Sequence, residues 1–360
     1  MDQKFKKECL DNCHKILPDF PNNSKQFKVK PLTGGLTNLI YLISYQSTEK
    51  VDGKKTDKKV LYRKFGPGKS GNFEKINQEN EICRDLGEKG IGPKIYGSFD
   101  GGRIEEFLEN SVPLAISQLD HYYQSIAEKM AKIHQLDSQK LNKSNCLINM
   151  LEEFEEKNLE YLASNPSDKE SRKLFERFQK SKKFVFEEII TPYSAQNKED
   201  NNMLLNSICF SHNDLQELNI MLNEKSDEIY LIDFEYSGYT YLPYDFANHF
   251  SEFRVDNASS VPSGFDFNES LYPALDFRRR FVETYLRFRE DFQGSNTEFT
   301  AVTIDQFLEQ IEKFVMVSDC LWGGWSIFSQ NDEITGFDFL AYGTCRLDAF
   351  ESRKAKIFIS

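Results

Sequence analysis

Two carboxylates and one amide stand at spacings that suit phosphoryl transfer. Asp214 is followed five residues later by Asn219, and Asp233 lies fourteen residues beyond the amide. In phosphoryl transfer one acidic side chain accepts the proton of the attacking hydroxyl, while an Asn and an Asp hold the magnesium that neutralises the phosphates. The three residues therefore predict a phosphotransferase, although Asn and Asp are also common in turns that do no chemistry.

Short apolar runs precede both acidic residues and indicate how they are held. Residues 209–211 and 230–232 are predicted strands, so Asp214 and Asp233 follow strand ends, where side chains are exposed but rigidly placed. The order of groups matches the H-R-D-x-x-x-x-N catalytic loop and the metal-binding Asp of protein kinases. Asn213 stands at the Arg position, and Phe-Glu replaces Phe-Gly after the metal-binding Asp.

The composition limits the kinds of protein that this chain can be. Its 360 residues allow one to three domains, and a net charge of −12 argues against a general nucleic-acid binder, whose affinity rests on basic side chains. The sequence has no apolar run of about 18 residues and no apolar core near Met1, so we expect neither a membrane span nor a signal peptide. The seven cysteines include no Cys-x-x-Cys pair and predict free thiols in a reducing compartment, hence the cytosol.

Strand-like segments prevail in the first part of the chain and helical segments in the rest, which predicts an α+β fold with two lobes. Residues 1–108 form a small sheet-rich N-lobe and residues 109–360 a larger, mainly helical C-lobe, with the nucleotide between them, which is a protein-kinase-like layout. The predicted elements are strands at 39–44 and 60–65, a helix at 74–89, a hairpin of 95–99 with 103–107, helices at 119–133 and 304–315, and loops at 194–206 and 255–270.

The N-lobe holds candidate contacts for a nucleotide. Gly34 and Gly35 precede the first predicted strand, where a loop could approach phosphates without interference from Cβ atoms, although such a pair is often only a turn. Arg63 lies in the middle of the next strand, from which it could reach the phosphates and pair with Glu79; an exposed strand cation is the alternative. At the end of the N-lobe, backbone groups of Glu106 and Leu108 could hydrogen-bond to adenine. The predicted ATP-binding residues are therefore Gly34, Gly35, Asn38, Arg63, Glu79, Glu106 and Leu108.

Several motifs together resemble the choline/ethanolamine kinase family, whose members have a protein-kinase-like fold and phosphorylate small amino alcohols. The resemblance extends over roughly residues 30–353. The His-Asn-Asp loop, the Ile-Asp-Phe-Glu segment and the Trp motif are its most specific parts. The matching segments are Gly34–Asn38, Gly92–Gly97, His212–Asn219, Ile232–Tyr239, Tyr244–Phe253 and Leu321–Ile327.

The resemblance implies ATP-dependent phosphorylation of choline, the first step of the CDP-choline route to phosphatidylcholine. It implies Asp214 as the base, Gln216 as a further catalytic residue, Asn219 and Asp233 as metal ligands, and Glu235 close to a second metal ion. Oxygen ligands of this kind suit Mg²⁺, and Mn²⁺ as well. The resemblance also implies a homodimer, with choline and ATP as small-molecule partners.

Choline's trimethylammonium group donates no hydrogen bond, so a binding site has to stabilise it with aromatic faces. Trp322 and Trp325, the two tryptophans, are three residues apart and would lie on one side of a helix. Aromatic residues at helical spacing are usually core, but the presence of the catalytic loop in the same chain favours a cation site. By the resemblance, the choline-binding residues are Asp214, Tyr236, Glu252, Trp322, Trp325, Phe337 and Tyr342.

Three neighbouring features leave alternatives open. Asp245 is either a further carboxylate for the cation or a structural hydrogen-bonding hub, and His212 is expected to pack rather than to act as an acid or base. Residues 253–257 hold a single aromatic residue, Phe253, where choline kinases often carry more. The rim of the pocket is therefore expected to be more polar or more open.

Other functions fit parts of the same pattern. An ethanolamine or dual-specificity kinase would need about three hydrogen-bond acceptors for a primary ammonium, whereas choline needs apolar and aromatic surface, which the Trp motif supplies. An aminoglycoside-type phosphotransferase would be expected to show a larger acidic cleft. A non-catalytic choline-binding module would not need Asp214, Asn219 and Asp233 together.

Overall fold

The chain folds into two compact units. The computed structural model describes residues 3–32, 38–52, 54–66, 73–137, 143–196, 203–289, 300–331 and 336–359. The first unit comprises Met1–Val112 and Leu222–Phe234, and the second comprises Pro113–Met221 and Glu235–Ser360. Residues 222–234, which fall within the predicted C-lobe of residues 109–360, are grouped with the first unit. Leu231 N donates to Ile91 O there at 2.9 Å.

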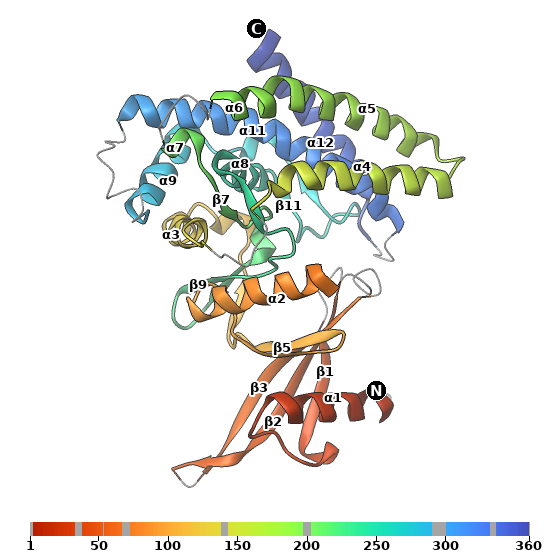
Figure 1. Cartoon of the computed structure of the whole chain (residues 1–360), viewed down its shortest axis with the longest axis vertical. Helices are drawn as coiled ribbons and strands as arrows, with labels where there is room; N and C mark the ends of the chain where they lie inside the picture. Colours follow the sequence, from red (N-terminus) through yellow and green to blue (C-terminus); the bar gives the residue numbers. More distant parts are fainter. Residues whose placement is uncertain are drawn as a thin grey trace. The chain divides into compact units, whose positions relative to one another are not determined.

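The first unit contains an antiparallel sheet of five strands with the order β1-β2-β3-β5-β4 (Figure 1). The charged residues that we expected to link two short strands instead extend β2 and β3 into a long hairpin, which pairs from Asn38 opposite Phe65 to Val51 opposite Lys54. The strands are β1 (Phe27–Leu32), β2 (Asn38–Val51), β3 (Lys54–Phe65), β4 (Ile95–Phe99) and β5 (Gly102–Glu106).

Helix α1 (Gln3–Ile16) packs against this sheet. Its Cys9 and Cys13 are fully buried in one apolar cluster with Ile43, Tyr62 and Ile104 of the strands. The predicted helix at 74–89 is confirmed as α2 (Phe73–Glu88). Strands β6 (Ser111–Pro113), β8 (Ile220–Asn223) and β9 (Glu228–Leu231) form a further sheet with the order β6-β8-β9.

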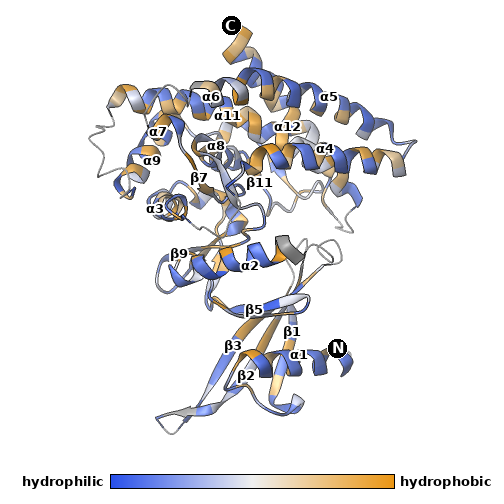
Figure 2. Cartoon of the chain, in the orientation of Figure 1, coloured by the Kyte–Doolittle hydropathy of each residue, from blue (hydrophilic) through white to orange (hydrophobic). Residues whose placement is uncertain are grey.

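The second unit is mainly helical, as predicted. Its longest helix, α11, carries apolar residues along its length among polar ones (Figure 2) and packs against α4, α5, α8 and α12. The helices are α3 (Tyr123–His134), α4 (Cys146–Ser164), α5 (Lys169–Val185), α6 (Thr191–Gln196), α7 (Met203–Asn206), α8 (Leu242–Glu252), α9 (Leu275–Arg287), α11 (Ala301–Phe328) and α12 (Phe339–Lys354).

Two short strand pairs accompany these helices. Strands β7 (Ile208–Ser211) and β10 (Gly238–Tyr241) are antiparallel, as are β11 (Val255–Asp256) and β12 (Asp266–Phe267). The second pair lies in a segment that we expected to be a loop, because a two-residue strand leaves almost no periodic signal. Of the helices in the described ranges, none is both long and apolar enough to cross a membrane.

Candidate active site

The loop after β7 holds Asp214 and Asn219 close together in the second unit. Asn219 Nδ2 donates to the backbone oxygen of Asp214 at 2.8 Å and to its Oδ2 at 2.9 Å. Because the amide nitrogen is used in this way, Oδ1 of Asn219 faces away from Asp214. An amide oxygen oriented in this way is a suitable Mg²⁺ ligand, because Mg²⁺ prefers oxygen donors.

Asp245 of α8 holds the backbone of this loop. Its carboxylate accepts hydrogen bonds from His212 N at 3.2 Å, Asn213 N at 2.8 Å and His134 Nε2 at 2.9 Å. Burial would raise the pKa of Asp245, but the hydrogen bond and charge of His134 outweigh burial and lower that pKa. Asp245 is fully buried, so the structural hub is the alternative that the structure supports.

Two histidines pack beside the loop. His212 is fully buried, and its Nδ1 accepts from Asp214 N at 3.3 Å, in agreement with the expected structural role. His249 is also fully buried and bonds through Nδ1 to the carbonyl of Leu215 at 2.9 Å. Asn213 has φ 66, a left-handed conformation that Asn tolerates better than most residues. Buried side chains therefore fix the loop from α8.

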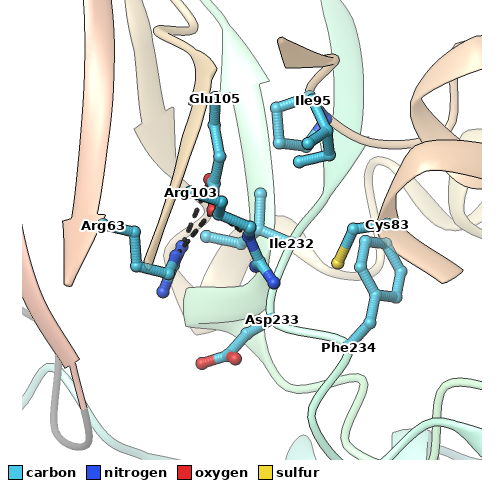
Figure 3. Close-up of a pocket in the computed structure, with 9 residues that line it drawn as sticks. Arg63, Cys83, Ile95, Arg103, Glu105, Ile232, Asp233 and Phe234 are labelled. Carbon is cyan, nitrogen blue, oxygen red and sulfur yellow. Dashed lines mark hydrogen bonds and ion pairs between the residues drawn. The ribbon is translucent and has the colours of Figure 1, made fainter. Parts of the chain in front are cut away.

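In the first unit, Asp233 lines a small pocket with two guanidinium groups (Figure 3). The pocket also involves Cys83, Ile95, Ile232 and Phe234, and Arg63 and Arg103 both bond to Glu105. Asp233 follows β9 with φ 62, and in this view its side chain is drawn below those of the two arginines. The pocket is thus lined by both basic groups and a carboxylate, as a metal–phosphate site requires.

Arg63 pairs with a different carboxylate from the one we expected. Its Nε lies 2.7 Å from Glu105 Oε1, whereas Glu79 pairs with Arg103, at 2.9 Å from Nη1. Arg103 Nε also lies 2.6 Å from Glu105 Oε1. Sequence reasoning missed Glu105, although strand alternation puts Arg103 and Glu105 on one face of β5. Burial would raise the pKa of Glu105, but Arg63 and Arg103 lower it to about 2.

The other predicted nucleotide contacts are less fully described. Gly34 and Gly35 lie outside the described residues, and Asn38 is described only by its backbone, at the start of β2. Glu106 N donates to Lys94 O at 2.8 Å, and the Leu108 carbonyl accepts from Ser111 N at 3.3 Å. Recognition of adenine would therefore rest on the other backbone groups of Glu106 and Leu108.

All five predicted aromatic residues meet in one cluster of the second unit. The rings of Tyr236 and Trp322 are 5.3 Å apart, those of Trp322 and Trp325 5.9 Å, and those of Phe337 and Tyr342 5.5 Å. Trp322 is 5% exposed, and its Nε1 donates to Asn248 Oδ1 at 2.7 Å. Trp325, Tyr236 and Phe337 are half-buried, so part of the cluster remains accessible.

Phe265 is a sixth ring of this cluster that the sequence did not reveal. Its ring lies 5.3 Å from both Phe337 and Tyr342. Gly264 has φ +77, and a Cβ there would lie 2.1 Å from the carbonyl oxygen of Gly336. Glycine at 264 therefore lets the segment before β12 approach the start of α12 closely enough to add Phe265.

Glu252, a predicted cation-binding residue, is paired with a buried arginine. Arg346 Nη2 lies 2.5 Å from Glu252 Oε1 and donates to the Tyr342 hydroxyl at 2.8 Å. Arg346 Nη1 also lies 3.4 Å from Asp319 Oδ1. Glu252 and Arg346 are 3% and 0% exposed, so the carboxylate is largely balanced inside the protein. The same arginine holds the ring of Tyr342.

The side chains of Gln216 and Glu217, which follow Asp214 in the loop, accept hydrogen bonds from Asn257. Its Nδ2 donates to Gln216 Oε1 at 3.2 Å and to Glu217 Oε2 at 3.3 Å. Burial, with the charge of Glu252 as a smaller cause, raises the pKa of Glu217 to about 7. Glu235, the expected neighbour of a second metal ion, is half-buried in the second unit.

The predicted meeting of Asp233 with Asp214 and Asn219 around one metal ion stays a prediction. Asp233 belongs to the first unit, and the other two residues belong to the second. Each unit holds groups with the required chemistry, namely two arginines with a carboxylate in one and a carboxylate with an oriented amide in the other.

Comparison with known proteins gives a consistent picture. The family model described as "Choline/ethanolamine kinase" matches residues 29–351. A probable choline kinase 3 of Arabidopsis thaliana is 30% identical over 94% of this chain and 90% of its own. A probable ethanolamine kinase of the same plant is 29% identical over 92% and 81%. The crystal structure of a choline kinase from Cryptosporidium parvum superposes with a TM-score of 0.79 at 25% identity, over 98% of this chain and 96% of that one.

Proposed function

The chain belongs to the choline/ethanolamine kinase family, and we propose that it transfers the γ-phosphoryl group of ATP to the hydroxyl of choline. The observation that carries this proposal is the cluster of Tyr236, Trp322, Trp325, Phe337 and Tyr342 in the unit that holds Asp214. Aromatic faces attract a cation by about 0.5–2 kcal/mol each and need no hydrogen-bond donor from it. A trimethylammonium group is the amino-alcohol head that suits them best.

Asp214 acts as the base in this proposal. Its carboxylate accepts the hydroxyl proton of choline while that oxygen bonds to the γ-phosphorus, and the bond from phosphorus to the β-phosphate oxygen breaks to release ADP. Asn219 and Asp245 support this role, because they fix the carboxylate and the backbone around it. Gln216, two residues further on, is the second residue that we assign to the catalytic loop.

Mg²⁺, or Mn²⁺ in its place, would be held by Asn219 and Asp233, with Glu235 nearby. The ion would neutralise charge on the phosphates. Arg63, kept in place by Glu105, supplies a fixed positive charge to the same phosphates. We assign adenine to the backbone of Glu106 and Leu108.

Ethanolamine is the second candidate substrate. A specific observation favours it: Glu217, Glu252 and Asn257 place oxygen acceptors near the catalytic loop, where a primary ammonium could bond. Both carboxylates are nevertheless engaged, Glu252 by Arg346 and Glu217 by Asn257. We therefore propose a preference for choline with some activity on ethanolamine.

We place the enzyme in the cytosol, as a homodimer in the CDP-choline route to phosphatidylcholine. The thiols support the location: all seven cysteines are free, and burial raises the pKa of most of them. The dimer is a property that the family resemblance implies.

Steady-state kinetics with both alcohols test the proposal. With Mg²⁺ and ATP, we expect ADP formation that depends on the alcohol and a larger kcat/KM for choline. A larger kcat/KM for ethanolamine would reverse the substrate assignment. Choline binding without ADP formation would instead identify a non-catalytic module.

A further inference from the structure

The short ribbon of β11 and β12 connects the aromatic cluster with the catalytic loop. Val255 of β11 is a fully buried member of the cluster, and Phe267 of β12 packs against it. Two residues after Val255, Asn257 bonds to Gln216 and Glu217. Three consecutive residues thus reach from the proposed cation site to the residues that follow the proposed base.

Asn257 supplies the donors for a buried carboxylate. Its backbone N–H donates to Glu217 Oε1 at 2.9 Å, and its Nδ2 donates to Glu217 Oε2 at 3.3 Å. Within the described part of the chain, both hydrogen bonds that another residue donates to this carboxylate come from Asn257. Because Glu217 is 0% exposed, water does not replace a lost donor there.

The same amide nitrogen also holds Gln216. It lies 3.2 Å from Gln216 Oε1, and Gln216 N donates to the carbonyl of Asp214 at 3.0 Å. The Gln216 side chain is therefore tied to the ribbon, while its backbone is tied to the base. A movement of β11 would be transmitted to the loop through Asn257, by its backbone N–H as well as its side chain.

We propose that Asn257 is a positioning residue that couples occupation of the aromatic cluster to the placement of Gln216 and Glu217. This inference rests on the proposed function. A trimethylammonium group fills the ring cluster and contacts the ribbon that carries Val255. A primary ammonium has no methyl groups with which to do so. Asn257 therefore favours choline in the catalytic step, although it is not itself a ring of the site.

The first test compares Asn257→Ala with Asn257→Asp in the full chain. Alanine removes the donor, and aspartate keeps the shape of the side chain but adds a third carboxylate beside Glu217 and Glu252. Loss of hydrogen bonds to a buried carboxyl group predicts a kcat for choline about 5- to 30-fold lower in Asn257→Ala. It predicts a larger loss in Asn257→Asp, with the KM for ATP unchanged in both variants. Full kcat in Asn257→Asp would overturn the inference.

Asn268→Ala is the matched control, because Asn268 follows β12 and bonds through Oδ1 only to Ser270 among the described residues. We expect its kcat for choline to stay within about twofold of the wild-type value, since one exposed cap contributes little. An equal loss in Asn268→Ala and Asn257→Ala would show that the ribbon is merely destabilised, which would overturn the inference.

A double-mutant cycle with Gln216→Ala separates positioning from a general structural role. If Asn257 acts through Gln216, Asn257→Ala should lower kcat at least threefold less in the Gln216→Ala background than in wild type, and should lower the choline-to-ethanolamine ratio of kcat/KM. Strictly additive losses would overturn the inference. Wild-type enzyme that turns over neither alcohol would overturn the proposed function itself, so the two failures are distinguishable.

Discussion

The side-chain amide of Asn219 is oriented by the residue that we assign as the base. Because Nδ2 bonds twice to Asp214, the oxygen is turned away as a potential metal ligand. The spacing of five residues between Asp214 and Asn219 therefore lets the base itself orient the amide.

Trp325 tests the aromatic cluster most selectively, because it is half-buried whereas Trp322 is nearly sealed. Removing one aromatic face from a cation costs about 0.5–2 kcal/mol, so Trp325→Ala should raise the KM for choline about 2- to 30-fold and leave the KM for ATP unchanged. Trp325→Phe keeps a ring and should lose less. Equal changes in both KM values would favour a core-packing role.

His249 gives a pH dependence of stability. Burial lowers the pKa of His249 from its ordinary 6.5 to about 4, although the Leu215 carbonyl and Asp245 act to raise it and His212 adds to the lowering. Between these values the unfolded chain binds a proton that the folded chain does not. The stabilisation is therefore complete above pH 6.5 and is lost as the pH falls towards 4.

The free energy of unfolding should accordingly fall by roughly 2 kcal/mol between pH 7 and pH 5 from this residue alone. The measurement compares denaturant unfolding of wild type and His249→Gln at both pH values. The variant retains a donor for Leu215 but no titrating ring, so its loss should be smaller by that amount. The same slope in both proteins would contradict the low pKa.

At the scale of elements, the junction of the segment before β12 with the start of α12 builds part of the aromatic cluster. Gly264 and Gly336 both have left-handed backbones, with φ +77 and +93. A Cβ at 264 would meet the backbone of Gly336, whereas a Cβ at 336 has no neighbour within 4 Å. Alanine at either position would introduce backbone strain, but only alanine at 264 would also introduce a steric clash. Comparing the two variants therefore distinguishes the effect of the clash from that of the strain.

Gly264→Ala should raise the KM for choline several-fold more than Gly336→Ala. Both variants carry left-handed strain of about 1–2 kcal/mol, but only the first displaces Phe265 from Phe337 and Tyr342. The test is the KM for choline in each variant, with the melting temperature as the check on strain. Similar KM values in the two variants would show that this junction does not shape the site.

The elements also show what the sequence could and could not predict. Long periodic segments and the two strands before the acidic residues were recognisable, because burial on one face leaves a regular apolar pattern. Phe265 and Asn257 were missed, since their segment forms strands of two residues, whose role depends on distant partners. The prediction that Arg63 pairs with Glu79 was also wrong, because Glu79 and Glu105 are equally plausible partners until the register of β3 with β5 is known.

At the scale of the whole molecule, the two units divide the chemistry. The pocket of Arg63, Arg103 and Asp233 lies in the first unit, and the loop of Asp214 with the aromatic cluster lies in the second. Phosphoryl transfer needs both sets, because catalysis in this class consists of positioning and charge stabilisation. The motifs predicted Arg63 and Asp233 of the first set and Asp214 with the aromatic residues of the second, whereas Arg103 was not predicted. Whether the two sets meet around one nucleotide stays a prediction that activity measurements test.

A homodimer is the assembly that we predict for the whole protein. Light scattering coupled to size-exclusion chromatography should give twice the chain mass of 41.9 kDa. The mass should stay constant on dilution through the micromolar range, because dimers that function as enzymes have large, stable interfaces. A mass of one chain at every concentration would contradict the dimer without affecting the proposed reaction.

The most direct test of the central claim is phosphocholine formation followed by ³¹P NMR in wild type and Asp214→Ala, at saturating choline and Mg²⁺-ATP. We expect a phosphocholine signal that grows as ATP is consumed in wild type. In the variant, the rate should fall by several orders of magnitude while choline affinity, measured by calorimetry, changes little, because the base acts mainly in the transition state. Phosphocholine formed at the wild-type rate by Asp214→Ala would contradict the account.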